Sequence, residues 1–340
     1  MRDTYDYNHI VFCINDSRLP KLNPDGYQTL SLKDLANHDD VHLIPYPLHH
    51  LPYIFRYCYF VCNSRKFKKL FGQSIKNLFY PYFFDKKFVS DKPLCFILIG
   101  GANLPVSYLH YLKKTYPNCK IVFFFRDLVS VRKKLSPDIV HDSSIDIEMS
   151  FDEGEAEKYG MHFCCEYSSV IDLSEHNNYP CCDVFFCGQA KDRYERLLQY
   201  YHYLTSKGLK CDFYITEVPE SQQVKLDGIH YNQYMSYKEM LYRSYNAKCL
   251  LDINQLEASG GYTSRFYEAI MYNRKLISDN PITCDSKFYN GIDIIYVTKP
   301  EDVTQKYIDN INSKVDYHYS GEFSPLRMIE TVEKILKEHK

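Results

Sequence analysis

Short apolar runs alternate with helix-forming segments along this 340-residue chain, and the alternation occurs in two series. Continuous apolar runs of about four to eight residues are typical of strands that are buried on both faces of a parallel sheet. Helices between such strands supply the crossover connections that parallel pairing needs. The alternation therefore predicts an α/β protein, and it is fairly specific for that class.

The first series fills the N-terminal half of the chain. Its expected strands are His9–Ile14, Val41–Tyr46, Leu94–Ile99, Lys120–Phe125 and Ile145–Phe151. Residues 105–115 form a helix candidate, because Pro105 stands at a position that favours a helix start. A short acidic helix is expected after the fifth strand and should end at Gly160.

The second series follows a polar stretch at residues 174–180. Its expected strands are Asp183–Cys187, Cys211–Ile215, Lys248–Ile253, Lys275–Ser278 and Ile292–Val297. Its expected helices are Lys191–Ser206, Ser236–Ser244, Ser264–Tyr272 and Glu301–Asn312, and a terminal helix is expected at Glu330–Lys340.

Two doubly wound domains follow from these two series, because each series can form its own parallel sheet covered by helices. We expect one domain over residues 1–175 and another over residues 181–320. Residues 321–340 are expected to form a C-terminal helix that can cross back to the first domain. A chain of 340 residues is long enough for both.

Composition narrows the class of protein. Hydrophobic residues make up 45% and charged residues 25%, as in a globular protein, and the formal net charge of −2 gives no basic field for nucleic acid. The 13 cysteines include no pair of matched C-x-x-C motifs, so we expect neither zinc nor disulfides. No signal peptide or run of 18 apolar residues is present, which favours a soluble, cytoplasmic protein.

The first candidate binding segment follows the strand at residues 183–187. Gly188 lets the backbone pass close to a ligand, and Gln189 comes next. Lys191 and Arg193 stand where a helix opens, and the positive end of a helix already favours anions. Together these residues could hold a diphosphate. A tight turn followed by solvated charges is the alternative interpretation.

The second candidate segment follows the strand at residues 248–253 and contains Gly260, Gly261, Tyr262, Thr263, Ser264, Arg265 and Glu268. Thr263 or Ser264 can cap the next helix, whose free N–H groups make a phosphate cradle. Arg265 could pair with phosphate through its planar fork. Glu268 lies one turn into that helix, where its carboxylate could accept hydrogen bonds from a ribose diol. An ordinary capped helix with an exposed Glu–Arg pair is the alternative.

Residues 182–295 resemble the donor-binding domain of GT-B glycosyltransferases, in particular bacterial polysaccharide- and lipopolysaccharide-assembly enzymes. The resemblance is carried by Val184–Gly188, the helix with Lys191 and Arg193, Gly261–Ala269, and Lys275–Ser278. It implies two Rossmann-like domains that face a central cleft, with a nucleotide-sugar donor bound by the C-terminal domain. Many relatives carry a second Glu where this chain has Gly260, and Glu257 is out of register, so retention or inversion stays open.

The resemblance also implies roles for single residues. Glu268 would bind the donor ribose, and the basic pair Lys191 and Arg193 would neutralise the diphosphate leaving group. The implied donor-binding set is Gly188, Gln189, Lys191, Arg193, Gly260, Gly261, Tyr262, Thr263, Ser264, Arg265 and Glu268.

No convincing Asp-x-Asp metal site is present, so the leaving diphosphate is expected to be stabilised without a metal. Lys191, Arg193, Arg265 and helix N-termini would take the place of the metal. No cofactor is expected, since the nucleotide-sugar is a substrate.

The N-terminal domain is expected to hold the acceptor, a glycan or a polyprenyl-linked molecule, at its strand ends. The candidate acceptor-binding residues are Asn15, Asp16, Asn103, Arg126 and His162. An inverting reaction needs a base, and Asp16, Asp127 or His162 could serve. We count Asp127 with Lys191, Arg265 and Glu268 as the catalytic candidates. A retaining reaction needs no such base.

Residues 53–92 differ from the rest of the chain in their charge. They contain nine Lys or Arg residues and only two Asp residues, a net charge of 9 − 2 = +7. Thirteen Tyr or Phe side chains lie among them. Residues 65–71 could form a basic amphipathic helix that lies on an anionic membrane surface on the inner face of the membrane. A core helix pair with a solvated basic face is the alternative.

These features together predict a metal-independent glycosyltransferase of the hexosyltransferase type that builds a surface polysaccharide. Two alternatives stay open. One is a non-catalytic GT-B-like subunit that binds a glycan or a partner, and the other is a nucleotide-sugar epimerase on the same scaffold. The intact Gly-rich loop with Arg265 and Glu268 favours catalysis.

Overall fold

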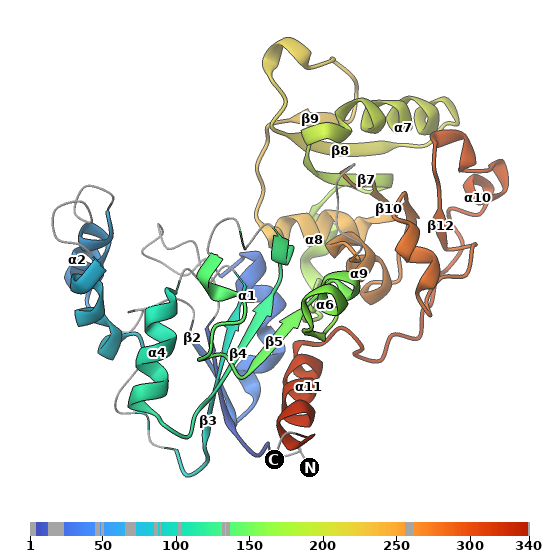
Figure 1. The fold of residues 1–340 in the computed structure, drawn as a ribbon. Coiled ribbons are helices and arrows are strands. Elements are labelled where there is room, and N and C mark those ends of the chain that lie inside the picture. The colour runs from blue at the N-terminus through green and yellow to red at the C-terminus, as the bar shows by residue number, and fades with distance from the viewer. Residues whose placement is uncertain are drawn as a thin grey trace. The chain divides into compact units, whose positions relative to one another are not determined.

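The computed structural model describes residues 5–12, 24–44, 48, 51–64, 73–84, 88, 90–100, 104–130, 133, 137–255 and 261–338. The chain forms two compact units. Unit 1 comprises Met1–Pro24, Gln28–Ser169 and Phe323–Lys340, and unit 2 comprises Asp25–Tyr27 and Val170–Glu322. Figure 1 shows the elements of both.

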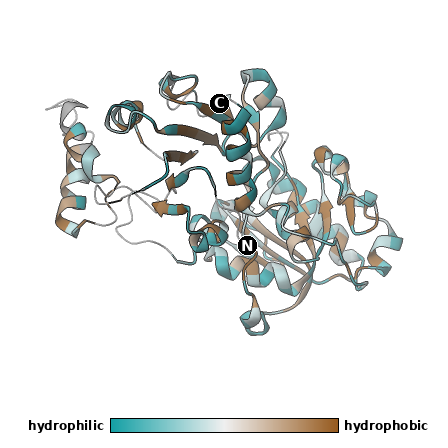
Figure 2. Ribbon diagram, turned by 90° about the horizontal axis from the view of Figure 1, so that it is seen from below, coloured by the Kyte–Doolittle hydropathy of each residue, from teal (hydrophilic) through white to brown (hydrophobic). Residues whose placement is uncertain are grey.

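The sheet of unit 1 has six parallel strands in the order β2-β1-β3-β4-β5-β6. The strands are β1 (Asn8–Phe12), β2 (Val41–Ile44), β3 (Leu94–Ile99), β4 (Lys120–Phe125), β5 (Ile147–Ser150) and β6 (His162–Phe163). The central strands are buried along almost their whole length, as continuous apolar runs predict. Figure 2 shows the strands mostly in the brown of hydrophobic residues.

Helices cover both faces of this sheet. The helices of unit 1 are α1 (Tyr27–Ser31, which begins at the boundary with unit 2), α2 (Tyr53–Asn63), α4 (Val106–Thr115), α6 (Glu153–Tyr159) and α11 (Pro325–Glu338), with short 3-10 helices η1 (Lys33–Asn37), η2 (Gln73–Tyr82) and η3 (Pro137–Ile139). Leu109 of α4 packs with Phe96 and Phe123 on one face. Ile97 and Val122, whose side chains point the other way, pack with α11.

The C-terminal helix α11 belongs to unit 1 although the chain before it, up to Glu322, belongs to unit 2. Its apolar face packs on the sheet through Met328, Ile329 and Val332. Glu333 of this helix accepts hydrogen bonds from the backbone N–H groups of Asp6 and Tyr7, at 3.2 and 3.1 Å. The expected crossing-back of the terminal helix is confirmed.

Glu333 also meets the buried imidazole of His9, at 2.8 Å between Oε1 and Nε2. Burial acts to raise the pKa of Glu333, but the hydrogen bond and charge of His9 and the two backbone donors outweigh it, so the pKa lies below its ordinary value. A carboxylate held in this way ties α11 to β1.

The sheet of unit 2 also has six parallel strands, in the order β12-β11-β10-β7-β8-β9. The strands are β7 (Cys182–Gln189), β8 (Cys211–Thr216), β9 (Ile229–Tyr231), β10 (Ala247–Asp252), β11 (Lys275–Ser278) and β12 (Ile294–Tyr296). The helices are α7 (Tyr194–Ser206), α8 (Tyr237–Asn246), α9 (Ser264–Met271) and α10 (Gln305–Asp309), with 3-10 helices η4 (Ser174–Asn178), η5 (Lys191–Arg193), η6 (Glu220–Gln222), η7 (Pro281–Asp285) and η8 (Pro300–Asp302).

Both faces of this second sheet are buried as well. Leu197 of α7 and Ile308 of α10 pack with Phe186 and Leu251 in one cluster. Leu250 alternates with Leu251 along its strand and is equally buried, on the side where α8 and α9 contact β10. The expectation of two doubly wound α/β halves is confirmed.

Two local differences separate the structure from the sequence prediction. The short strands β6 and β9 have no apolar run of their own and were not expected. The helix expected at Glu301–Asn312 is broken into η8 and α10, because Val303 is extended and Thr304 caps a new helix by accepting from the N–H of Tyr307. The region 65–71 lies outside the described residues.

Candidate functional site

The site begins where the strand order of unit 2 reverses. From β7 the chain builds the sheet toward β8 and β9, and it later returns to place β10 on the other side of β7. In open parallel sheets, ligands bind beyond the carboxyl ends of the strands at such a reversal. Here those ends are Gly188 and Gln189 of β7, and Asp252 of β10 with Ile253 directly after it.

Arg193 spans this reversal point. Its Nε donates to the carbonyl of Gln189 at 3.0 Å, and one terminal nitrogen donates to the carbonyl of Ile253 at 2.5 Å. The side chain is buried, and its guanidinium lies 5.3 Å from the ring centre of Phe186. Arg193 therefore joins the ends of β7 and β10 without a carboxylate ion-pair partner in the described part of the chain.

Arg265, near the start of α9, bridges the same two strands. One terminal nitrogen donates to the carbonyl of Cys187 at 2.5 Å, and the other lies 3.4 Å from Oδ1 of the buried Asp252. Its guanidinium lies 4.8 Å from the ring centre of Phe186. Both arginines therefore stack on one buried ring, which fixes their positions.

Gly188 is the point at which the two guanidinium groups come together. A Cβ atom at this position would lie 2.6 Å from a terminal nitrogen of Arg265 and 2.9 Å from one of Arg193. A side chain at this position would have to displace both guanidinium groups. Burial, followed by the charge of Arg265, lowers the pKa of Arg193 to about 10. Two cations held so close have an electrostatic cost that a bound anion would relieve.

Replacing Gly188 by alanine is expected to destabilise the protein by about 1–3 kcal/mol, because the new methyl group overlaps two fixed guanidinium groups. Denaturant unfolding monitored by circular dichroism measures this. Gly154→Ala is the matched control, since the nearest atom to a Cβ there is a side-chain oxygen at 3.5 Å. Equal stability of Gly188→Ala and the parent protein would contradict the described crowding.

The N-terminus of α9 carries the second predicted segment. Thr263 caps the helix by accepting from the N–H of Phe266 at 3.3 Å, and Ser264 at its first position is exposed. Tyr262 stacks on Phe266 with ring centres 4.2 Å apart. The carbonyl of Gly261 accepts from the side chain of Asn280 at 2.9 Å. Gly260 lies outside the described residues.

Glu268 is a buried carboxyl with one oxygen unused. Its Oε1 accepts from the hydroxyl of Tyr237 at 3.3 Å, and its buried Oε2 has no hydrogen-bond partner within the described chain. Burial is the main cause that raises the pKa of Glu268 to about 7; Arg265 and Tyr237 act to lower it. A buried carboxyl with a free oxygen is a costly arrangement that a donor from a ligand would improve.

The turn between β7 and α7 is strained at Lys191. Its φ angle is 43°, in the left-handed region that side chains other than glycine rarely adopt, and its side chain is exposed. Strain of this kind often accompanies functional turns. Gln189 beside it donates to the carboxylate of Glu217 at 2.7 Å. The predicted helix at Lys191–Ser206 thus begins as the 3-10 turn η5 and continues as α7.

The predicted acceptor residues lie in unit 1, and three of them, Asn15, Asp16 and Asn103, fall outside the described residues. Arg126 follows β4; it forms an ion pair with Glu166, and its guanidinium lies 4.5 Å from the ring centre of Tyr167.

Asp127 and His162, the other two candidates in unit 1, are exposed. The acceptor candidate His162 and the base candidate Asp127 thus both present exposed side chains.

Four residues of the site were not predicted: Asp252, which pairs with Arg265; Tyr237, which donates to Glu268; and the pair Arg196 and Asp279. Arg196 lies one helical turn after Arg193 and contacts Asp279 at 2.6 Å. Asp279 also accepts from the N–H of Asn254 at 2.7 Å, and burial raises its pKa to about 6. In the sequence, the polar residues at the carboxyl ends of β10 and β11 could have pointed to Asp252 and Asp279.

One known structure agrees with this architecture. No protein-family model and no curated protein matches the sequence. The N-terminal domain of Candida albicans trehalose-6-phosphate phosphatase is 11% identical and aligns with 98% of this chain and 98% of its own, with a TM-score of 0.52. The chain has the GT-B-like two-domain fold.

Two further structures align less well with this GT-B-like chain. UDP-N-acetylglucosamine 2-epimerase from Rickettsia bellii aligns with 98% of this chain and 95% of its own, at a TM-score of 0.49 and 13% identity. An α-glucosyltransferase in complex with UDP and DNA aligns with 71% of this chain and 79% of its own, at 0.48 and 9%. At such identities the function has to be argued from the site.

Proposed function

We propose that this protein is a glycosyltransferase that takes a sugar from a nucleoside-diphosphate-sugar donor. The donor binds in unit 2, at the point where the strand order reverses. The observation that carries the proposal is the arginine pair, Arg193 and Arg265, held on Gly188 at the carboxyl ends of β7 and β10. Planar guanidinium groups suit phosphate oxygens, and the pair has an excess of positive charge that a diphosphate would balance.

The leaving diphosphate gains negative charge as the bond to the sugar breaks. Arg193 and Arg265 would stabilise that charge from fixed positions, since carbonyl groups and the Phe186 ring already hold them. The free N–H groups at the start of α9 would add to this. Glu268 would accept hydrogen bonds from the donor ribose through its unused oxygen.

Binding of nucleoside diphosphates is the first test. Thermal unfolding is measured with UDP, GDP, ADP, TDP or CDP present, and a binder of the folded protein raises the midpoint by mass action. A rise with at least one of them, matched by isothermal titration calorimetry, supports the proposal. The absence of any rise or heat with all five would refute it.

Product analysis then separates the activity from its alternatives. The matching nucleotide-sugars are incubated with the protein, and the products are resolved by mass spectrometry and NMR. Release of nucleoside diphosphate, by transfer to an added glycan or lipid acceptor or by hydrolysis, supports the transferase. An epimeric nucleotide-sugar would identify an epimerase, and tight binding without turnover would identify a binding subunit.

The acceptor side of the proposal includes a membrane surface. Tyr53, Ile54, Phe55 and Tyr57 of α2 are each more than half exposed, which is unusual for four large apolar or aromatic side chains on one helix. Together with the net charge of +7 over residues 53–92, this supports binding to an anionic membrane and to a polyprenyl-linked acceptor there. No helix in the described residues is long and apolar enough to cross a membrane.

Liposome flotation is expected to recover the protein with vesicles that contain anionic lipid and less of it with neutral vesicles. Replacing both Ile54 and Phe55 by serine should reduce the bound fraction, because it removes exposed apolar area from α2. Ile292→Ser, a similarly exposed residue of unit 2, is the control. Equal recovery of the parent and the double variant would show that α2 does not contribute to membrane binding.

A further inference from the structure

A pocket of unit 2 lies at the amino ends of its strands, whereas the arginine pair lies at their carboxyl ends. It has a volume of about 550 Å³ and is lined at the amino ends of β10 and β11 by Lys248 and Arg274, among others. Arg193 and Arg265 contact the carboxyl ends of strands in the same parallel sheet. The pocket is therefore separate from the proposed donor site, and its size is that of a small-molecule site.

The pocket wall carries positive charge and no acidic residue. Its lining includes three cations, Lys248, Arg274 and Lys314, and neither Asp nor Glu. Lys248 is partly neutralised from outside the lining by Asp183, at 2.6 Å. In the described chain, Arg274 and Lys314 form no ion pair with a carboxylate. The local excess of positive charge thus comes from these two side chains.

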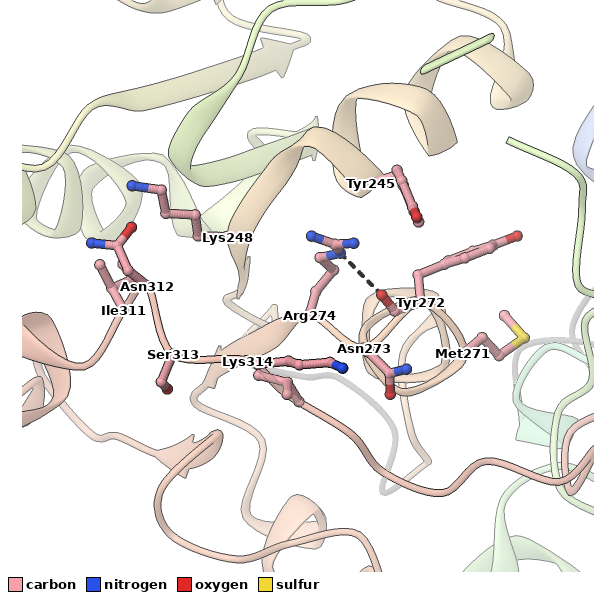
Figure 3. A pocket seen from close by; sticks show the side chains of 11 residues that line it. Tyr245, Lys248, Met271, Tyr272, Asn273, Arg274, Ile311, Asn312, Ser313 and Lys314 are labelled. Atoms are coloured by element: carbon pink, nitrogen blue, oxygen red, sulfur yellow. Dashed lines mark hydrogen bonds between the residues drawn. The ribbon is translucent and has the colours of Figure 1, made fainter. Parts of the chain in front are cut away.

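Arg274 is the central group of the pocket, as Figure 3 shows. Its Nε donates to the carbonyl of Tyr272 at 3.0 Å, and its guanidinium lies 4.4 Å from the ring centre of Tyr245. These contacts fix a partly buried guanidinium and close the end of α9. A helix-capping role accounts for the Tyr272 contact, but it does not account for a cavity with two further lysines around the same group.

The rest of the lining is suited to a hydroxylated organic body. Tyr245 and Tyr272 form an aromatic wall on one side of Arg274, and Asn312 lies on the other side in Figure 3. Asn312 is exposed, and its amide can both donate and accept hydrogen bonds. An arginine fork with lysines nearby matches a phosphate group, and aromatic and amide groups match a sugar ring.

We propose that this pocket is a second, non-catalytic binding site for a small phosphorylated metabolite of sugar-phosphate size. Arg274 and Lys314 hold its phosphate, and Tyr245 and Asn312 contact its body. The site touches the far ends of two helices of the donor site. Helix α8 begins at Tyr237, the partner of Glu268, and has Tyr245 near its end, while α9 begins beside Arg265 and ends at the pocket.

Isothermal titration calorimetry with glucose 6-phosphate and with inorganic phosphate tests the site, and glucose is the uncharged control. Saturable binding of at least one anion, with no heat from glucose, is expected. The variants Arg274→Gln and Lys314→Glu should each weaken it at least about tenfold, or about 1.4 kcal/mol. Lys225→Glu, an exposed lysine outside the pocket lining, should leave the affinity unchanged.

A variant of the donor site distinguishes binding at that site from binding at this pocket. Arg265→Ala should retain anion binding, so that failure of the proposed transferase would not affect this result. Lys314 is exposed, so Lys314→Glu is decisive even when Arg274→Gln unfolds. The proposal is overturned by no saturable anion binding, by binding that Lys314→Glu leaves unchanged, or by binding that Arg265→Ala abolishes.

Discussion

Replacing Arg265 by alanine is expected to lower the rate of donor cleavage by about 10²–10³-fold, or about 3–4 kcal/mol of transition-state stabilisation. The guanidinium of Arg265 is fixed by the carbonyl of Cys187, by Asp252 and by the Phe186 ring. It therefore stands ready for charge that develops on the leaving diphosphate, with little reorganisation. Arg265→Lys should lose nearly as much, because a compact ammonium lacks the planar fork whose separate nitrogens contact the Cys187 carbonyl and Asp252 and can face phosphate at the same time.

The measurement is the rate of nucleoside-diphosphate release, together with the affinity for the free nucleotide. Removing Arg265 also leaves the buried Asp252 without its cation, so the unfolding midpoint is recorded for each variant. Arg327→Ala, which removes an exposed arginine of α11 that forms a surface ion pair with Glu330, is the control. A folded Arg265→Ala protein with the parent rate would exclude Arg265 from catalysis.

Sequence patterns predicted the strands well where a strand is long and buried. Phe123 and Phe213 lie in continuous apolar runs, and such runs are typical of strands that are buried on both faces of a sheet. The edge strands β6 and β9 escaped prediction because two or three residues are too short to produce a period. The break before α10 depends on burial of Val303, a tertiary contact that local helix preference does not contain.

The candidate site was predictable to the extent that topology determines it. In a parallel sheet, residues that follow different strands meet at one edge, so Gly188, Arg193 and Arg265 were expected near each other. The part played by Tyr237 was not predictable, since it depends on how α8 packs beside α9. The same holds for the crowding at Gly188, which only atomic positions reveal.

Glu268 is expected to make nucleotide binding depend on pH. Burial raises its pKa from the ordinary 4.5 to about 7, so both protonation forms are populated near neutrality. Ribose hydroxyls donate hydrogen bonds, so the ionised form is the better acceptor. Affinity for the nucleoside diphosphate should therefore rise from pH 6 to pH 8 with a midpoint near the pKa of Glu268.

The ionisation of Glu268 affects folding in the opposite direction: a rise in pH strengthens nucleotide binding but lowers the stability of the folded protein. A carboxyl whose pKa is higher in the folded protein than in the unfolded chain favours folding while it is protonated. That contribution is complete below pH 4.5 and is lost as the pH rises through about 7. The parent protein should therefore lose stability over this range relative to Glu268→Gln, whose side chain does not titrate.

Glu268→Gln tests both statements, because it keeps the shape of the side chain and removes its charge. It should bind nucleoside diphosphate about 10–100-fold more weakly at pH 8, as expected when hydrogen bonds to a charged acceptor are lost. Calorimetric titrations at several pH values measure this, with Glu301→Gln, an exposed residue of η8, as the control.

The difference between the parent and Glu268→Gln isolates this one carboxyl. Asp279, with a pKa of about 6, and the ligand phosphate also titrate in the same range, but they do so in both proteins. The difference in binding free energy should thus follow a single titration near pH 7. A difference that stays constant from pH 6 to pH 8 would show that the ionised carboxylate of Glu268 does not hold the ribose.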